Sequence, residues 1–250
     1  MPRLFVPASA IDNGVTVIDG VAARHLSALR VKAGEQVRIV DDGGTEHGLV
    51  VVTATSDSVE CRVTWSRPAS GDPELHVTVL QAVCKDGMAE AIDAAVAAGA
   101  AAIAPVVTER TIVDLSGERA ARRAERWQAV AREAAQVAFR ATVPEVFPVR
   151  PLREAVNALA PSTRLLVCAM TDNAKPLAER TFETNSVALV IGPEGGFSVA
   201  DLDTLAMAGA EAVHLGPRVF RSRLAASHAL IALMLRAGEL TKAVAQAPQW

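Results

Sequence analysis

The spacing of apolar residues changes near residue 70, and this change constrains the fold more than any other feature of the sequence. Upstream of it, short β-branched runs alternate with turn residues, a pattern typical of strands. Downstream, apolar runs alternate with segments that repeat at the period of a helix. The sequence therefore predicts two domains, at residues 1–68 and 74–242, with a linker of Pro, Gly and small polar residues over 66–73.

The upstream region is expected to fold as a small, partly closed β-barrel. Several short strands and one short helix within 68 residues favour that architecture. The sequence Asp41-Asp42-Gly43-Gly44 stands between two apolar runs and predicts a hairpin turn. The predicted strands cover residues 3–6, 15–18, 36–40, 48–53 and 59–65, and the predicted helix covers residues 21–31.

The downstream region is expected to be an α/β domain. Strands that alternate with helices pair in parallel and form a sheet covered by helices on both faces. The predicted strands cover residues 75–83, 101–107, 164–170, 187–191 and 212–215. The predicted helices cover residues 87–98, 118–139, 152–159, 198–208 and 222–236.

The composition of the chain excludes several classes of protein. The net charge is −3, so an RNA-binding role would have to rest on local clusters of cations. The three cysteines form no CxxC pair and the five histidines have no metal-site spacing, so we expect neither a disulfide framework nor a metal site. The first nine residues lack the pattern of a signal peptide and no apolar run could span a bilayer, so we expect a cytoplasmic protein without a membrane partner.

A glycine-rich loop follows one of the predicted strands, in the sequence LVIGPEGGFS at residues 189–198. Ser198 and Asp201 have the spacing of a capping box, which predicts that a helix begins there. Glycines allow the backbone to approach a ligand closely, and a helix start presents free N–H groups. A ligand-binding loop and an ordinary tight turn both fit these residues. The loop has neither the GxGxxG of a dinucleotide fold nor the lysine of a P-loop.

A second strand runs into a similar loop, in the sequence VHLGPRVFR at residues 213–221. We expect the two strands to lie side by side, with both loops at the carboxyl edge of the sheet, where open α/β folds bind ligands. Arg218, Arg221 and Arg223 all lie at this edge, and three guanidinium groups within six residues favour an anionic partner such as phosphate. The helix over residues 222–236 is apolar nearly all round, so it is either buried or part of a subunit interface.

These two loops and four further segments resemble the RsmE family, the ribosomal RNA small-subunit uridine N3-methyltransferases of the SPOUT superfamily. The matching segments occur in order through nearly the whole chain. They are PRLF at residues 2–5, QAVCK at 81–85, PVVTER at 105–110, the helix and turn at 127–145, IGPEGGF at 191–197 and LGPRVFR at 215–221.

The resemblance implies a PUA-like β-barrel followed by a SPOUT α/β domain with a C-terminal trefoil knot. It also implies S-adenosyl-L-methionine as cofactor, small-subunit ribosomal RNA or the assembled subunit as partner, and a homodimer. The cofactor would be bound by three loops. Their residues are Ala169, Met170, Ile191, Gly192, Glu194, Gly195, Gly196, Leu215, Gly216, Val219, Phe220, Arg221 and Leu224.

The activity that the resemblance implies is methyl transfer to N3 of a uridine in 16S ribosomal RNA. Because uracil N3 loses its proton at or near attack, a guanidinium group could stabilise the anion. We expect Arg218 in this role, with Arg221 holding phosphate or cofactor. The residues expected to contact RNA are Arg3, Arg30, Lys85, Arg110 and Arg140.

The chain departs from the family pattern after the last loop. Where the family usually reads RTETA, residues 221–225 read RSRLA, so Arg223 replaces a carboxylate. This change motivates an alternative, an RNA-binding SPOUT relative with weak or altered methyltransferase activity. A further alternative is an unrelated nucleotide-dependent enzyme that uses residues 192–196 as a phosphate loop and binds ATP or NAD.

Overall fold

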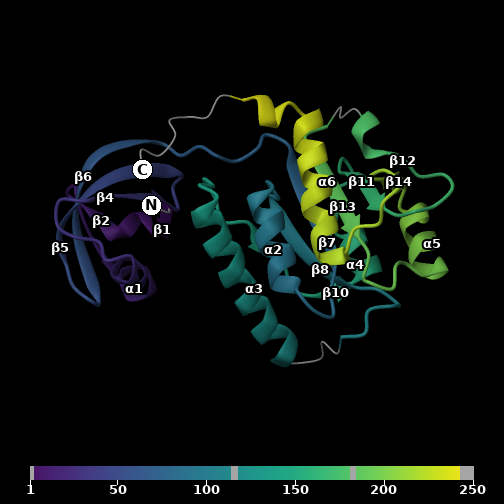
Figure 1. Cartoon of the computed structure of the whole chain (residues 1–250), viewed down its shortest axis with the longest axis horizontal. Coiled ribbons are helices and arrows are strands. Elements are labelled where there is room, and N and C mark those ends of the chain that lie inside the picture. The colour runs from purple at the N-terminus through teal and green to yellow at the C-terminus, as the bar shows by residue number, and fades with distance from the viewer. Residues whose placement is uncertain (1–2, 114–117, 181–183, 243–250) are drawn as a thin grey trace. The chain divides into compact units, whose positions relative to one another are not determined.

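The computed structural model describes residues 3–113, 118–180 and 184–242, which form two compact units (Figure 1). The first unit comprises residues 3–72 together with Ala135–Thr142, and the second comprises the other described residues. The division between Asp72 and Pro73 falls inside the predicted linker. Ala135–Thr142 differs from the expectation, because the sequence assigns it to the second domain and its contacts lie in the first unit.

The first unit is built on a six-stranded sheet in the order β1-β4-β5-β6-β3-β2. Only β1 and β4 pair in parallel, and the other neighbouring strands of this sheet are antiparallel. The strands are β1 (Arg3–Val6), β2 (Ile11–Asp12), β3 (Val15–Asp19), β4 (Gln36–Asp41), β5 (Thr45–Ala54) and β6 (Ser58–Pro68). The predicted hairpin turn at residues 41–44 is confirmed between β4 and β5.

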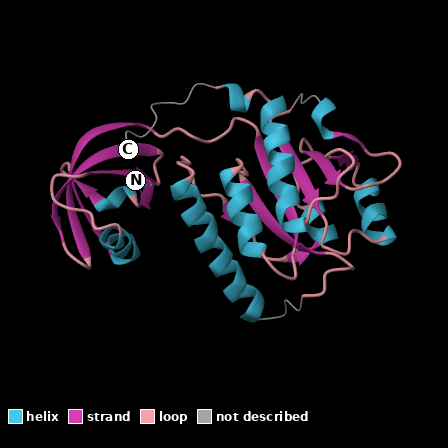
Figure 2. Cartoon of the chain, viewed as in Figure 1, coloured by secondary structure: helices cyan, strands magenta, loops and turns pink. Residues whose placement is uncertain are grey.

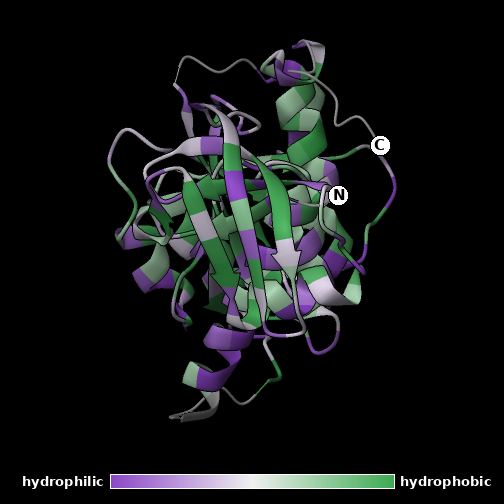
Figure 3. Cartoon of the chain, turned by 90° about the vertical axis from the view of Figure 1, so that its left-hand side faces the viewer, coloured by the Kyte–Doolittle hydropathy of each residue, from purple (hydrophilic) through white to green (hydrophobic). Residues whose placement is uncertain are grey.

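One face of this sheet and the helix α1 (Gly20–Ala28) enclose the core of the first unit. Leu4, Leu26, Ile39 and Leu49 are among its fully buried side chains. Apolar and polar residues alternate along the strands, as Figure 3 shows, because successive side chains of a strand point to opposite faces. The helix α1 ends earlier than predicted, since the chain turns at Arg30 with a left-handed φ of 57°.

The second unit contains an eight-stranded sheet, and its main path runs β10-β8-β7-β13-β11-β14-β12, with β9 paired to β8. All of these pairs are parallel, as predicted. The strands are β7 (His76–Ala82), β8 (Ala102–Val107), β9 (Glu145–Val146), β10 (Arg150–Pro151), β11 (Arg164–Cys168), β12 (Lys175–Pro176), β13 (Ser186–Ile191) and β14 (Glu211–His214).

Five α-helices of the second unit accompany this sheet (Figure 2). They are α2 (Met88–Ala97), α3 (Glu118–Val137), α4 (Leu152–Asn157), α5 (Val199–Met207) and α6 (Ser222–Arg236). The last residues of α3 belong to the first unit by their contacts. Short 3-10 helices occur at η1 (Ala8–Ala10), η2 (Leu177–Glu179) and η3 (Glu239–Thr241). Within the described ranges, none of the helices combines the length and the apolar character needed to cross a membrane.

The strand order corrects one expectation from the sequence. The strands β13 and β14 were expected to be neighbours, but β11 lies between them and pairs with both. The chain thus places three loops, after β11, β13 and β14, at the same carboxyl edge of the sheet. Strand order depends on contacts between distant segments, so a local pattern could not fix it.

The helix α6 has the bounds that its apolar pattern predicts. Ala226, Leu230 and Leu233 are buried, and the helix packs against α2, β7 and β13. Ile231 and Leu235 on the same helix remain 46% and 58% exposed. One side of α6 is therefore part of the core of the second unit, and another side presents apolar residues at its surface.

Candidate active site

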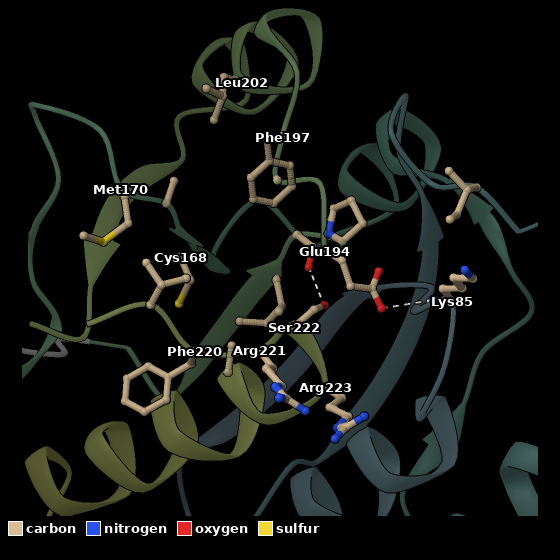
Figure 4. A pocket seen from close by; sticks show the side chains of 18 of the residues that line it. Lys85, Cys168, Met170, Glu194, Phe197, Leu202, Phe220, Arg221, Ser222 and Arg223 are labelled. Atoms are coloured by element: carbon tan, nitrogen blue, oxygen red, sulfur yellow. Dashed lines mark hydrogen bonds between the residues drawn. The ribbon is translucent and has the colours of Figure 1, made fainter. Parts of the chain in front are cut away.

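An open cavity of about 810 Å³ lies in the second unit, where β11 and β13 end and α6 begins (Figure 4). A cavity of this size can hold a ligand as large as a nucleoside-based cofactor. The loops after β11, β13 and β14 all contribute residues to its wall. The lining consists of Lys85, Asp86, Ile112, residues 168–171 and 191–194, Gly196, Phe197, Leu202, residues 219–223 and Ala225.

The loop after β13 is fixed by the start of α5. The predicted capping box is confirmed: the Ser198 hydroxyl accepts from Asp201 N at 3.1 Å, and the Asp201 carboxylate accepts from Ser198 N at 3.0 Å. The same carboxylate accepts from Glu109 N at 3.3 Å, and the Arg110 guanidinium donates to the carbonyl of Gly195 at 2.9 Å. The loop after β8 is thereby connected by hydrogen bonds to the glycine-rich loop and to the start of α5.

Two glycines in this loop are required for different reasons. A Cβ on Gly192 would lie 3.0 Å from the ring of Phe197, so the ring packs closely on the backbone. Gly196 has a φ of 71°, in the left-handed region that other residues avoid. Gly192 is therefore needed for the close packing of Phe197, and Gly196 for the backbone conformation of the loop.

A buried polar network connects the start of α6 to the loop after β13. The Ser222 hydroxyl donates to the carbonyl of Gly192 at 2.5 Å, and the Gln81 side-chain amide donates to Ser222 Oγ at 3.1 Å. The Cys84 thiol lies 3.5 Å from the same hydroxyl oxygen. Gln81, Cys84 and Ser222 are all buried. Since a buried polar group must find partners, this network fixes the relative positions of β7, the loop after β13 and α6.

Cationic side chains gather along one part of the cavity wall. Lys85, Arg221 and Arg223 all line it, and Figure 4 shows the two guanidinium groups on the same side of Ser222. Arg223 Nε lies 3.0 Å from the carboxylate of Glu90, and the backbone N–H of Lys85 donates to Glu194 at 3.1 Å. This wall can attract a phosphate group or stabilise a negative charge that develops during a reaction.

The sulfur of Cys168 also lines the cavity, at the end of β11. Burial raises the pKa of the Cys168 thiol to about 12. A thiol with such a pKa is protonated at neutral pH and is a poor nucleophile. Cys168 therefore lines the cavity in its neutral, protonated form.

Most of the residues that the resemblance assigns to cofactor binding lie in the cavity wall. These are Ala169, Met170, Ile191, Gly192, Glu194, Gly196, Val219, Phe220 and Arg221. Four others lie outside the lining. The carbonyl of Gly195 accepts a hydrogen bond from Arg110, and the N–H of Gly216 donates to His214 Nδ1 at 3.1 Å. Leu224 is also outside the lining, and its neighbour Ala225 lines the cavity. Leu215 is the fourth of these residues that lie outside the lining.

The expected catalytic pair is separated by the structure. Arg221 lines the cavity at the start of α6, whereas Arg218 is exposed and does not form part of the wall. Pro217 and Arg218 are exposed and lie outside the lining, whereas Val219, Phe220 and Arg221 belong to it. Sequence spacing alone could not choose between two arginines three residues apart.

The residues expected to contact RNA also have different environments. Lys85, Arg30 and Arg110 are exposed and remain available for that role. Arg3 and Arg140 are 4% and 3% exposed, which corrects the expectation for both. Arg3 donates to the carbonyls of Ser70, Phe139 and Arg140, and Arg140 forms an ion pair with Asp72. Their guanidinium groups stabilise the first unit from within.

Sequence reasoning missed the role of Ser222, which links Gln81 and Cys84 to the carbonyl of Gly192. A small polar residue at the first position of an apolar helix was the available signal, because a buried hydroxyl needs a partner. Phe197 was also missed as part of the wall. Within the described ranges, no group of three or more His, Cys, Asp or Glu side chains could hold a metal ion.

Comparison with known proteins shows the family to which this chain is similar. A family model described as an RNA methyltransferase domain matches residues 72–234. The ribosomal RNA small subunit methyltransferase E of Mycobacterium bovis is 36% identical, over 91% of this chain and 89% of that protein. The protein of the same name from Bacillus subtilis is 26% identical, over 93% of this chain and 96% of its own length.

A solved structure agrees with the fold of the whole chain. The ribosomal RNA small subunit methyltransferase E of Neisseria gonorrhoeae, bound to S-adenosyl methionine, matches with a TM-score of 0.86 and 29% identity. The match covers 94% of this chain and 97% of that chain. The second unit, with its parallel sheet and loop-lined cavity, is thus an RNA methyltransferase domain. The chain belongs to the ribosomal RNA small subunit methyltransferase E family.

Proposed function

We propose that this protein transfers a methyl group from S-adenosyl-L-methionine to N3 of a uridine in 16S ribosomal RNA. The observation that carries the proposal is the cavity where three loops of an RNA methyltransferase domain meet beside Arg221. Relatives named as ribosomal RNA small subunit methyltransferases match nearly the whole chain, and one of them was solved with S-adenosyl methionine.

The residues of the cavity fit this cofactor. Apolar side chains of Ile191, Phe197 and Phe220 offer a surface for an adenine ring, and the Phe197 ring is positioned by its packing on Gly192. Ala169, Met170, Glu194, Gly196 and Val219 belong to the same proposed set. When bound, the cofactor supplies an activated methyl group on a sulfonium centre.

The protein would position the uracil and stabilise the negative charge that develops on its ring. N3 of uracil would lose its proton to solvent, so negative charge would develop on the ring. The bond from N3 to the methyl group would form as the bond from methyl to sulfur breaks, with S-adenosylhomocysteine as the leaving group. We assign the stabilisation of the negative charge to Arg221, which lines the cavity, and retain Arg218 as a flanking contact to phosphate. Since N3 lies on the pairing edge, the uridine must be unpaired when it enters the site.

The same proposal includes the fold of each domain, the oligomeric state, the cellular location and the RNA contacts. A six-stranded sheet with one α-helix supports a PUA-like barrel at residues 1–68, and the insertion of β11 between β13 and β14 supports a SPOUT domain at 74–242 with a trefoil knot. The exposed Ile231 and Leu235 on α6 support a homodimer. A cytoplasmic site of action follows from the ribosomal substrate, and Lys85, Arg30 and Arg110 are the proposed RNA contacts.

A direct assay tests the function. Small subunits from cells that lack this modification are incubated with the full chain and a tritiated methyl donor, and the RNA is then mapped by mass spectrometry. We expect one labelled uridine that carries its methyl group on N3. Label on another atom or another base would contradict the assignment.

A second function is favoured by one observation, the presence of Arg223 in the cavity wall where the family usually has a carboxylate. Arg223 could turn the protein into an RNA-binding relative with weak or altered methyl transfer. Such a protein would bind the small subunit in the same assay and transfer no label.

A further inference from the structure

The outer face of the first sheet carries an exposed tryptophan. The side chain of Trp65 is 37% exposed, although the other described tryptophan, Trp127, is buried. The strand register sets Arg3, Arg38, Gly48 and Trp65 in one row across β1, β4, β5 and β6. This row lies on the face opposite the one that contributes Leu4, Ile39 and the rest of the apolar core.

The indole ring of Trp65 packs directly on the backbone of Gly48. A Cβ on Gly48 would lie 2.1 Å from Cε2 and Nε1 of Trp65, which no side chain could occupy. The backbone of Gly48 has no left-handed φ, so glycine is needed here for the close approach of the ring and not for its conformation. The ring is therefore held against the sheet in a defined orientation, with part of it exposed.

Two guanidinium groups flank the ring. Arg67 Cζ lies 4.8 Å from the centroid of Trp65 and Arg38 Cζ lies 5.8 Å from it. Both arginines retain partial exposure. Cations over an indole are attracted to its face, and the flat guanidinium adds a second plane to the aromatic surface.

A single buried carboxylate organises these cations. Glu46 lies 2.7 Å from Arg67, 2.9 Å from Arg3 and 3.9 Å from Arg38. One negative charge among three guanidinium groups leaves a positive excess of two on this face. Since Arg3 is buried, the excess is presented to solvent by Arg38 and Arg67, next to Trp65.

We propose that Arg38, Trp65 and Arg67 form a binding site for single-stranded RNA, in which an unpaired base stacks on the indole and the guanidinium planes while the arginines pair with the adjoining phosphates. Unpaired bases stack on aromatic rings and guanidinium planes, whereas the bases of a duplex are already stacked. The positive excess complements the phosphate backbone. This site deepens the proposed function, on which it rests, by naming where the RNA outside the target uridine is held.

The test measures fluorescence anisotropy of a labelled 12-nucleotide single strand bound to the full-length protein. We expect Trp65→Ala to raise the Kd by about 5- to 100-fold, the usual range for loss of one stacked base. Trp65→Phe should restore part of the affinity, because it keeps an aromatic face. Arg24→Ala, which removes an exposed cation on α1, is the matched control and should leave the Kd unchanged. Arg38→Ala should reduce the salt dependence of binding, whereas Trp65→Ala should not.

Several results would overturn this site: an unchanged Kd in Trp65→Ala, equal competition by a duplex of the same length, or a change of oligomeric state in Trp65→Ala with RNA affinity intact. Urea unfolding followed by circular dichroism checks the folding of the first unit in each variant, and binding of S-adenosylhomocysteine checks only the second unit, which alone lines that cavity. The proposed function fails separately, if the wild-type chain methylates no uridine while its affinity for the single strand still depends on Trp65.

Discussion

The first unit places arginines inside its structure, whereas the second unit places them around a cavity. Arg3 and Arg140 are almost fully buried, and their donors are bound to backbone carbonyls and carboxylates of the same unit. Arg221 is exposed and lines the cavity, and its side chain makes no capping hydrogen bond to α6. A buried guanidinium must be neutralised, so it stabilises a fold. An exposed one can serve a ligand.

The different environments of these arginines show that the charge of a side chain does not by itself identify a binding residue. Arg3 is the first residue of β1, and Arg221 directly precedes α6. Sequence patterns predicted a functional role for both arginines. Only the partners that surround each guanidinium distinguish them. The predictions that follow test whether the first set of arginines acts on stability and the second on activity.

The largest expected effect is on the stability of the first unit. Replacing Glu46 by Ala leaves Arg3 buried without its carboxylate partner, and removing one member of a buried ion pair costs about 3–5 kcal/mol. Urea unfolding, followed by circular dichroism, measures this loss of free energy of unfolding. Arg24→Ala on the surface should change it by less than about 0.5 kcal/mol. Comparable stability of the two variants would remove the structural role assigned to the buried arginines.

The next effect is on catalysis. Replacing Arg221 by Ala should lower kcat by about 10²- to 10³-fold, as expected for loss of one group that stabilises a developing charge. The free energy of unfolding should stay within about 0.5 kcal/mol of the wild type, because Arg221 is exposed. Arg218→Ala is the matched control and should affect the KM for RNA more than kcat. If Arg218→Ala proves the more damaging for kcat, the assignment of the two arginines must be exchanged.

A smaller effect is expected from the polar network behind the cavity. Ser222→Ala removes the hydrogen bond to the carbonyl of Gly192, and a buried bond of this kind is worth about 0.5–1.5 kcal/mol. We therefore expect the Kd for S-adenosylhomocysteine, measured by calorimetry, to rise about 2- to 10-fold. Ser222→Thr keeps the hydroxyl and should bind nearly as the wild type does. Equal weakening in both variants would mean that packing, and not the hydrogen bond, supports the loop.

The contrast between the units also predicts a response to acid. Burial tends to raise the pKa of the Glu46 carboxyl, but hydrogen bonds from Arg67 and the charge of Arg3 outweigh burial and hold the pKa below its ordinary value of 4.5. A depressed pKa adds stability that is complete above pH 4.5 and is lost as the pH falls through the folded-state pKa. The stability of the wild type should thus decrease below pH 4.5 more steeply than that of Glu46→Gln. Parallel curves would contradict this linkage.

The smallest effect is expected at the rim of the cavity. The ion pair between Arg223 and Glu90 joins side chains that are 31% and 52% exposed. Exposed pairs contribute about 0.2–1 kcal/mol, so Glu90→Gln should lower the thermal midpoint only slightly. If Arg223 serves a ligand instead, Glu90→Gln will change the KM for RNA by more than it changes stability.

The local fold could be read from the sequence because its causes are local. The helix α6 begins at Ser222 and ends at Arg236 as its apolar pattern predicts, and the capping box of Ser198 and Asp201 forms as spaced. The predicted helix over residues 118–139 ends at Val137 instead, because Phe139 takes a left-handed φ of 55° that closes the helix. The two glycine-rich loops after predicted strands, at residues 189–198 and 213–221, contribute nine of the 20 residues that line the cavity.

By itself, the sequence determined the two-part organisation, the parallel sheet of the second unit and the loops at its carboxyl edge. Periodicity and turn chemistry are properties of neighbouring residues, so they can be read along the chain. Tertiary structure alone decided that β11 separates β13 from β14, that Arg3 is buried while Arg221 is not, and that Trp65 rests on Gly48. Each of these depends on contacts between residues far apart in sequence, and burial changes the free energy of a charge or a ring only when those contacts exist.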